Sequence, residues 1–258
     1  YANSENSIIF WGMGVSQHVH GTDNSRCLIA LSLITGQVGR PGTGLHPLRG
    51  QNNVQGASDA GLIPMVYPNY QSVEDIDIRS FFEDKWGRSL DPSKGLTVVE
   101  IMNRIVSSQM FGMYVMGENP AMSDPDQNHA RTALSKLQHL VVQDIFFTET
   151  AWFADVIFPA SAQPEKAGTY TNSNRQVQIG FPVRKAPGDA KQDWKLIVDL
   201  ANRCRLNWNY KNVSSIYKEM ASMMSSLNNI SWERLEKEGA VCYPVDNETS
   251  FGNEILFS

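Results

Sequence analysis

The sequence predicts an α/β protein built from Rossmann-like units with parallel sheets, and three observations lead to this prediction. Short apolar runs alternate along the chain with stretches whose apolar residues recur at helical spacing. Hydrophobic residues make up 41% of the 258 residues, enough to form a core at this length. The buried apolar run expected at 8–10 leads into the glycine turn 11–14, with a helix expected over 26–34. Strand, glycine turn and helix are the usual order of a nucleotide-binding corner.

The remaining elements are justified in the same way. Apolar residues share one helix face at Val98, Ile101, Met102, Ile105 and Val106. Asp124 is expected to cap a helix over 125–138. The segment 67–91 is interpreted as an exposed excursion, and the chain after Pro159 as irregular. Strands are expected at 111–116, 140–142 and 156–158, the last two buried, and further helices at 192–204, 213–226 and 232–239.

The run 48–59 combines one fixed cation with several side-chain amides and has almost no apolar residues. Arg49 carries a planar fork that can hold a carboxylate or phosphate through two hydrogen bonds. Side-chain amides supply both donors and acceptors, so a cluster of them can bind the edge of a polar heterocycle. The alternative is a solvated polar loop. The glycine-rich segment 35–44 favours a ligand site, because its backbone can wrap an anion or a ring.

Charge and cysteine spacing argue against several classes of protein. A net charge of -5 without a basic stripe gives no reason to expect nucleic acid, and no apolar run reaches the length of a membrane span. The three cysteines show no metal-ligand spacing and are expected to be buried thiols. His18 and His20 alternate as a metal-binding pair can, but a channel lining or plain loop is favoured. Gly12-x-Gly14 lacks the third glycine of the dinucleotide fingerprint, which argues against a simple NAD-dependent dehydrogenase.

Several longer motifs occur together and in order. They are WGMGVSQ at 11–17, RGQNNVQG at 49–56, MGENP at 116–120, VQDIFFTETA at 142–151 and ADVIFP at 154–159. With these motifs the chain resembles the molybdopterin oxidoreductase superfamily. Within that superfamily it is most similar to the catalytic subunit of molybdenum- or tungsten-dependent formate dehydrogenase, of which it looks like a central segment.

The resemblance implies two-electron oxidation of formate to carbon dioxide at molybdenum or tungsten held by bis-molybdopterin guanine dinucleotide. Arg49 would orient the carboxylate of formate, and Gln51 would hold the pterin nearest the electron path. A 4Fe-4S cluster is expected in the parent protein with its ligands outside this chain. Electron-transfer subunits or an acceptor protein are the expected partners, and a cytoplasmic location is expected.

The resemblance also implies where the cofactor binds, because α/β sheets bind ligands at the carboxyl ends of their strands. Asp144 and Thr148 could instead cap the short helix at Thr150, and Asp155 could simply close a turn before a buried strand. No residue is assigned to the metal. The expected cofactor-binding residues are Met13, Gln17, Gly50, Gln51, Gly117, Glu118, Asn119, Ser123, Gln143, Asp144, Thr148 and Asp155.

Three consecutive segments are expected. Residues 1–50 would be the C-terminal part of a Rossmann-like cofactor domain, and 51–160 a second α/β nucleotide-binding domain. Residues 161–258 would be loops and helices leading, through 251–257, to a further cofactor domain. None of the three cysteines is followed by histidine, as the metal-ligating cysteine of the family is. The segment alone is therefore expected not to oxidise formate.

Two alternatives stay open beside formate oxidation. One is a related molybdenum enzyme that acts on another small oxyanion, with Arg49 binding that anion. The other is a cofactor-binding module without catalysis. Dye reduction with different substrates would separate the first from formate oxidation, and binding of guanine nucleotide without redox activity would mark the second.

Overall fold

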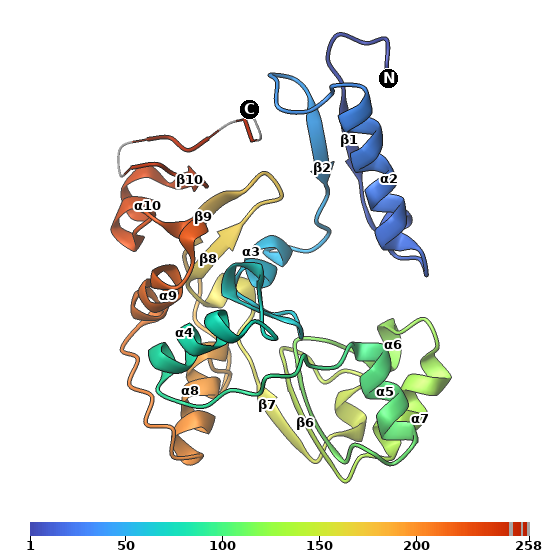
Figure 1. Ribbon diagram of the computed structural model, residues 1–258. Helices are drawn as coiled ribbons and strands as arrows, with labels where there is room; N and C mark the ends of the chain where they lie inside the picture. The colour runs from blue at the N-terminus through green and yellow to red at the C-terminus, as the bar shows by residue number, and fades with distance from the viewer. Residues whose placement is uncertain (248–249, 254, 257–258) are drawn as a thin grey trace. The chain divides into compact units, whose positions relative to one another are not determined.

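The computed structural model describes residues 1–247, 250–253 and 255–256 (Figure 1). The expected lead-in 251–257 lies partly outside the described residues. The described chain divides into two compact units, each assembled from stretches that are distant in sequence, whereas the three expected segments are consecutive. The first unit comprises 1–71, 169–179 and 217–258, and the second comprises 72–168 and 180–216.

The first unit begins with the expected strand, glycine turn and helix. Strand β1 (Ile8–Trp11) pairs in parallel with β2 (Gly44–Pro47), and α1 (Met13–Ser16) and α2 (Gly21–Ile34) connect them. Helix α2 starts five residues earlier than expected and runs alongside the strand pair (Figure 1). Parallel pairing requires such a crossover, which explains why a helix separates the two strands.

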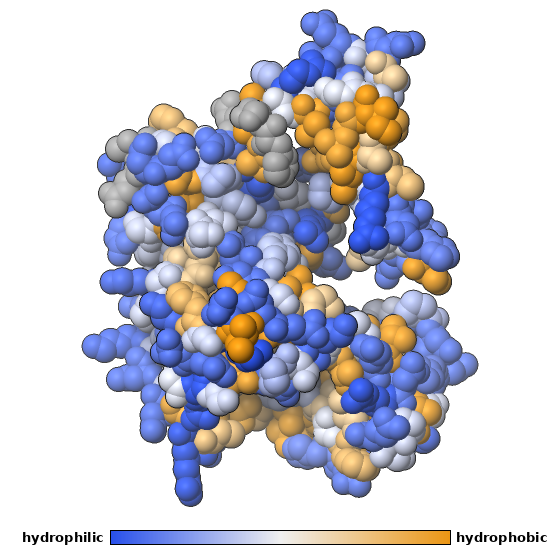
Figure 2. Space-filling view, viewed as in Figure 1, coloured by the Kyte–Doolittle hydropathy of each residue, from blue (hydrophilic) through white to orange (hydrophobic). Residues whose placement is uncertain are grey.

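The expectation that the first strand is buried was wrong. Ile8 is 44% exposed and Phe10 is 57% exposed in β1, and Ile34 at the end of α2 is 84% exposed. Figure 2 shows this apolar surface over β1, β2 and α2. A two-stranded sheet with one helix beside it has too few neighbours to cover both of its faces.

The polar run is half helical. Helix α3 (Val54–Asp59) follows Asn53, whose φ of 65° lies in the left-handed region that asparagine tolerates. Asn53 Oδ1 accepts a 2.9 Å hydrogen bond from the Thr171 amide. A Cβ on Gly56 would lie 2.2 Å from Asn53 Oδ1, so this close approach requires glycine.

A three-stranded sheet lies where the sequence predicted irregular chain. Strands β8 (Gly168–Thr171) and β9 (Gln176–Gly180) neighbour each other, and β10 (Ala240–Cys242) pairs with β9 in antiparallel orientation. Helices α9 (Val213–Ser222) and α10 (Trp232–Glu238) contribute to its core, as the 3₁₀ turn η4 (Ser225–Leu227) also does. The buried core residues are Val177, Tyr217, Met224, Leu227, Ile230, Leu235, Val241 and Val245.

Two short strands also belong to this part of the chain. Strands β3 (Val66–Tyr67) and β4 (Gln71–Ser72) form a small two-stranded sheet, with the 3₁₀ turn η1 (Pro68–Tyr70) between them. The turn carries Tyr70 toward α3, where its hydroxyl accepts a 3.2 Å hydrogen bond from Gln55 Nε2.

The second unit is built on a parallel sheet in the order β5–β6–β7, which confirms the three strands expected there. The strands are β5 (Gly112–Met116), β6 (His139–Asp144) and β7 (Val156–Pro159). Strand β6 is central and largely buried, whereas Val156 and Ile157 of the edge strand β7 are 36% and 37% exposed. The expected burial of β7 was therefore wrong, because an edge strand has a neighbour on one side only.

Helices pack beside this sheet. Helix α7 (Gln127–Ser135) packs against both α5 (Val98–Val106) and α6 (Pro120–Ser123) (Figure 1). Thr97 and Glu100 form a capping box at the start of α5, which confirms this helix at the expected bounds. Asp126, and not Asp124, caps α7, because its side chain accepts from the His129 amide while Asp124 ends α6.

The segment 67–91 is largely exposed, as expected, but it also contains a helix that was not expected. Helix α4 (Ile76–Trp86) begins at Asp75, whose carboxylate accepts from the amides of Asp77 and Ile78. Phe82 is fully buried and stacks with Trp86 at 5.0 Å between ring centroids. A cap and a single buried aromatic residue thus hold a helix whose sequence has little apolar periodicity.

The end of the second unit carries the helix expected near 192–204. Helix α8 (Asp193–Arg203) follows an isolated parallel bridge between Ala160 and Lys191. This bridge places the start of α8 beside the carboxyl end of β7. The 3₁₀ turn η2 (Ala151–Phe153) precedes β7 in the chain, and η3 (Gln163–Glu165) follows it.

The cysteines differ from the expectation of buried thiols. Cys27 and Cys204 are exposed and Cys242 is half-buried. Within the described ranges, no cluster of three or more His, Cys, Asp or Glu side chains could hold a metal ion. No helix in the described ranges is both long and apolar enough to span a bilayer.

Candidate functional site

A polar cavity of about 540 Å³ lies in the first unit. One wall is the loop between β2 and α3, and the other is the turn between β8 and β9. Two hydrogen bonds join the walls, from the Arg49 amide to Ser173 Oγ at 3.0 Å and from the Thr171 amide to Asn53 Oδ1 at 2.9 Å. The cavity is lined by His46, Arg49, Gly50, Gln51, Asn52, Asn53, Thr171, Asn172, Ser173 and Asn174.

Arg49 is held at one end of its guanidinium only. Its Nε donates a 3.1 Å hydrogen bond to Gln55 Oε1. Within the described part of the chain, its two terminal amines have no hydrogen-bond partner, and the residue lines the cavity. Two parallel N–H donors on a planar group match the two oxygens of a carboxylate. The arrangement can therefore bind a small planar oxyanion.

Gln55 connects Arg49 to a buried carboxylate that sequence reasoning did not assign to the site. Gln55 Nε2 donates to Asp59 Oδ1 at 2.7 Å, to Tyr70 Oη at 3.2 Å and to Tyr243 Oη at 3.4 Å. Asp59 is 5% exposed, and Tyr243 Oη donates to its other oxygen at 2.9 Å. The spacing of Gln55 and Asp59 on one helix face is visible in the sequence, whereas the contribution of Tyr243 is not.

Burial and the Asp59 charge change the acidity of both tyrosines. Burial, followed by the Asp59 charge, raises the pKa of Tyr70, while the Arg49 charge opposes that rise. Burial first, and then Asp59, also raises the pKa of Tyr243 well above its ordinary value. Both hydroxyls therefore stay protonated at neutral pH and remain hydrogen-bond donors.

A smaller hollow of about 110 Å³ adjoins the same loop. Met13 lines it together with Arg49, Gly50 and Gln51, so the structure brings these predicted residues together. Gln17 ends α1, where its amide donates to the Met13 carbonyl at 2.8 Å, and it does not line the hollow.

A second group of predicted residues gathers at the carboxyl edge of the β5–β6–β7 sheet. Gly117 follows β5 with a φ of 63°, and its amide donates to the Gln143 carbonyl at 2.8 Å. Glu118 is exposed and accepts a 2.9 Å hydrogen bond from Ser123 Oγ. Asp144 is half-buried, and its Oδ1 accepts from the Ile145 amide at 2.7 Å. This edge therefore offers carboxylates beside a turn whose residue Gly117 has no side chain.

Asn119 and Thr148 hold the turn that follows β6. Asn119 Oδ1 accepts from both the amide and the hydroxyl of Thr150, at 3.1 and 2.7 Å, and its Nδ2 donates to Glu149 at 2.7 Å. That last hydrogen bond holds the pKa of Glu149 below its usual range. Thr148 Oγ1 accepts from the Ala151 amide at 3.3 Å, as expected for a cap of the short helix η2.

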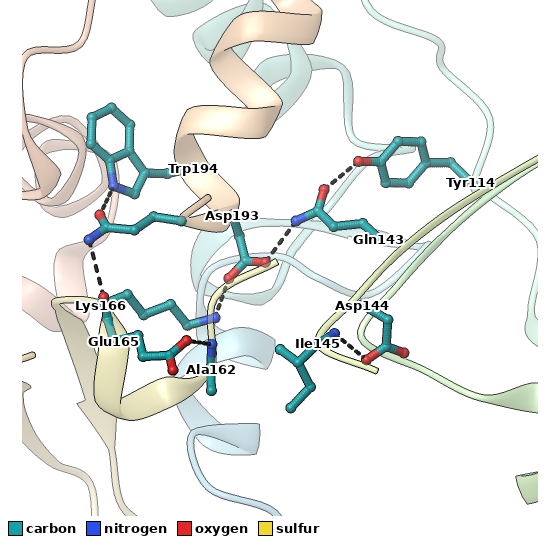
Figure 3. A network of polar contacts seen from close by, with 10 residues as sticks. Tyr114, Gln143, Asp144, Ile145, Ala162, Glu165, Lys166, Asp193 and Trp194 are labelled. Carbon is teal, nitrogen blue, oxygen red and sulfur yellow. Dashed lines mark hydrogen bonds and ion pairs between the residues drawn. The ribbon is translucent and has the colours of Figure 1, made fainter. Parts of the chain in front are cut away.

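Gln143 is fully buried behind the edge and is occupied on both sides of its amide (Figure 3). Its Nε2 donates to Asp193 Oδ1 at 2.7 Å, its Oε1 accepts from the Tyr114 hydroxyl, and Lys166 pairs with the same aspartate. Burial, and then the Asp193 charge, raises the pKa of Tyr114. Asp144 lies apart from this network in Figure 3, because neighbouring residues of a strand point to opposite faces.

Asp155 lies at the other end of the sheet. It precedes β7, and its Oδ2 accepts a 2.7 Å hydrogen bond from the Leu140 amide near the start of β6. The structure thus does not bring Asp155 together with the residues at the carboxyl edge. This contact matches the alternative in which Asp155 closes a turn before a strand.

A family model described as molybdopterin oxidoreductase matches residues 1–203. The chain belongs to the molybdopterin oxidoreductase family. This match covers both the Arg49 cavity loop and the carboxyl edge of the second unit, so the two predicted site regions fall within the family segment.

Relatives of this molybdopterin oxidoreductase chain have longer sequences. The F420-dependent formate dehydrogenase subunit alpha of Methanocaldococcus jannaschii is 44% identical over 99% of this chain and 38% of its own length. YrhE of Bacillus subtilis, whose formate dehydrogenase name is provisional, is 43% identical over 91% of this chain and 24% of its own. The chain thus spans about a quarter to two fifths of the length of these relatives.

Among solved structures, the acetylene hydratase of Pelobacter acetylenicus is similar, and the match covers 65% of this chain and 24% of the hydratase chain. The TM-score is 0.49 and the sequence identity is 18%, a likeness too weak to carry an argument.

The donor set of the cavity fits a pterin. The side-chain amides of Gln51 and Asn52 make no hydrogen bond within the described part of the chain, and both residues line the cavity. A pterin edge alternates donors and acceptors, which unengaged amides can match. A Cβ on Gly50 would meet nothing within 4 Å, so the loop leaves open space at this point.

Proposed function

We propose that this chain is a segment of the catalytic subunit of a formate dehydrogenase. The reaction converts formate into carbon dioxide and releases one proton and two electrons. The observation that carries the proposal is Arg49, whose terminal amines are unengaged within the described residues at a polar cavity. The name of the 44% identical relative from Methanocaldococcus jannaschii supports it.

Arg49 binds and orients the substrate in this proposal. Its two terminal N–H groups hold both oxygens of formate, which fixes the direction of the C–H bond. The positive charge also attracts the negatively charged formate to the cavity.

The cofactor proposed is bis-molybdopterin guanine dinucleotide with molybdenum or tungsten, and when bound it supplies the two-electron redox chemistry. Gln51 and Asn52 would hold a pterin edge through their amides, and Gly50 gives it room to approach. Met13 would pack against the same loop, and Gln17 would add a polar contact at the end of α1.

The carboxyl edge of the second unit is proposed to bind a guanine nucleotide arm. Asp144 would accept from the N–H groups of guanine or from ribose hydroxyls, and Gly117 lets the nucleotide approach. The other predicted residues at this edge split into two roles. Glu118 and Ser123 offer polar contacts at the surface, whereas Asn119, Gln143 and Thr148 hold the edge in shape.

Electron transfer and location complete the proposal. We expect the electrons to leave through a 4Fe-4S cluster whose ligands lie outside this chain, toward an electron-transfer subunit or acceptor protein. A cytoplasmic location is part of the same expectation.

The test is formate-dependent viologen reduction by the complete native polypeptide, with molybdenum and tungsten measured in the same sample. Rapid reduction of the dye supports formate oxidation. A metal-loaded protein that does not oxidise formate would overturn the assignment of formate as the substrate and leave the family membership intact. Reduction with another small oxyanion would then support the alternative in which Arg49 binds that anion.

A further inference from the structure

Gln55 is the only described residue that hydrogen-bonds the side chain of Arg49. It lies at the start of α3, and its amide spans the space between a cation at the cavity and a buried anion behind it. Arg49 Nε is 3.1 Å from Gln55 Oε1, and Gln55 Nε2 is 2.7 Å from Asp59 Oδ1. The orientation of Arg49 therefore depends on this single amide.

The amide of Gln55 can make both contacts because it carries an acceptor and a donor. Arginine can only donate hydrogen bonds, and an ionised carboxylate can only accept them. A side chain between the two must therefore present an acceptor to Arg49 and a donor to Asp59. This requirement also fixes which end of the Gln55 amide carries oxygen.

Asp59 is in turn held from two directions. Its Oδ1 accepts from Gln55, and its Oδ2 accepts from Tyr243 Oη at 2.9 Å. The carboxylate is 5% exposed and sits on the helix face of α3, one turn after Gln55. Because each oxygen has a partner in a buried position, the carboxylate has little freedom to turn and fixes the amide of Gln55.

We propose that Gln55 is a positioning residue, which, backed by Asp59 and Tyr243, fixes the Arg49 guanidinium so that its terminal N–H groups face the cavity for a carboxylate. This inference rests on the proposed function, because it assigns Arg49 to the substrate. In this inference, the side chains behind Arg49 hold its two terminal N–H groups in the direction that suits an anion with two oxygens, such as a carboxylate.

The network also explains why glutamate would not serve at position 55. A carboxylate there would still accept from Arg49 but would face Asp59 with a second negative charge. It would also reduce the positive potential that attracts the substrate. Gln55→Glu is therefore expected to weaken carboxylate binding more than the uncharged Gln55→Met, which has a similar volume.

The test is a double-mutant cycle in the complete, cofactor-loaded polypeptide. Wild type, Gln55→Met, Arg49→Lys and the double variant are compared by kcat and KM for formate with viologen. Acetate affinity is measured by calorimetry, because acetate carries the same carboxylate but no hydrogen on the carboxyl carbon and so is not oxidised. Bound metal and Tm are recorded for each variant.

We expect Gln55→Met to weaken acetate binding and lower kcat/KM by about tenfold to a hundredfold. In the Arg49→Lys background the same change should cost less than about twofold, because lysine has no Nε–H for Gln55 to hold. If Gln55→Met fails to load cofactor, Tyr243→Phe replaces it and should show a smaller loss with the same dependence on Arg49.

The control is Gln71→Glu, which removes a 2.8 Å hydrogen bond from Gln71 Nε2 to the Pro68 carbonyl in the same unit. It should leave acetate affinity unchanged. An equal loss in this control, or an undiminished effect of Gln55→Met in the Arg49→Lys background, would overturn the positioning role. A wild type that ignores formate but shows the same coupling with acetate would overturn the substrate and support the positioning role. A wild type that binds neither carboxylate would overturn both.

Discussion

Asp193 Oδ1 accepts a 2.7 Å hydrogen bond from Gln143 Nε2, so the first residue of α8 is joined to the carboxyl end of the central strand β6. The same aspartate pairs with Lys166, and Gln143 also accepts from Tyr114 (Figure 3). One carboxylate thus connects two strands, a helix and a loop behind the proposed nucleotide edge.

Asp193→Ala should lower the free energy of unfolding by about 2–3 kcal/mol, because it leaves the buried Gln143 amide and the Lys166 charge without this partner. Urea unfolding of the complete polypeptide measures the change. The matched control is Asp199→Ala, also on α8, which breaks the exposed ion pair of Asp199 with Lys191 and should cost less than about 1 kcal/mol. Equal losses in the two variants would contradict a special role for Asp193.

Arg49→Lys should retain bound metal while kcat/KM for formate falls by about a hundredfold or more, because lysine keeps the charge and loses the fork. Stopped-flow dye reduction and metal analysis of the same samples measure both quantities. Arg26→Lys is the control, since Arg26 pairs with Asp23 at the surface. Turnover at the wild-type rate in Arg49→Lys would remove Arg49 from the substrate site.

Gly56→Ala should lower the melting temperature, because the added Cβ would lie 2.2 Å from Asn53 Oδ1 and 3.1 Å from Thr171 Oγ1. The cost is expected at about 1–3 kcal/mol, typical of overpacking. Differential scanning calorimetry gives the change, with Gly14→Ala as control because a Cβ there meets nothing within 4 Å. A Gly56→Ala variant as stable as this control would show that Asn53 can move away freely.

Stability should fall as the pH rises above about 10, the ordinary pKa of tyrosine. Burial raises the pKa of Tyr217 in the folded chain, where its hydroxyl donates to the Ile230 carbonyl at 2.9 Å. Above pH 10 the unfolded state releases the proton while the folded state keeps it, so the contribution present below pH 10 is lost progressively. Urea midpoints between pH 8 and 11 should fall less steeply for Tyr217→Phe, and parallel slopes would refute this assignment.

Local signals in the sequence predicted the elements that local interactions specify. The stripe from Val98 to Val106 and the Thr97–Glu100 capping box lie within ten residues of one another, and α5 forms at those bounds. Helix α4 has a weak apolar pattern, because Phe82 alone is buried among its residues. Its cap at Asp75 was the available signal.

Interactions between distant residues explain what the sequence did not predict. Strand β9 is covered by Tyr217, Met224 and other residues that follow later in the chain, so its own sequence carries little of the pattern. The chemistry of Arg49 and the motif around it predicted a site residue, and the structure places Arg49 at a polar cavity while its role stays a prediction. The side chains that support Arg49 were not predicted, since Tyr243 reaches Asp59 from 184 residues away.

The interleaving of the first unit has a consequence for the order of events during synthesis. Ser173, which meets the Arg49 amide, leaves the ribosome 124 residues after it, and Tyr243 follows Asp59 by 184. At about 5–20 residues per second, the arginine loop waits roughly ten to forty seconds for its last partner. The polar cavity is therefore complete only after the turn between β8 and β9 has been synthesised, and Asp59 gains its Tyr243 partner later still.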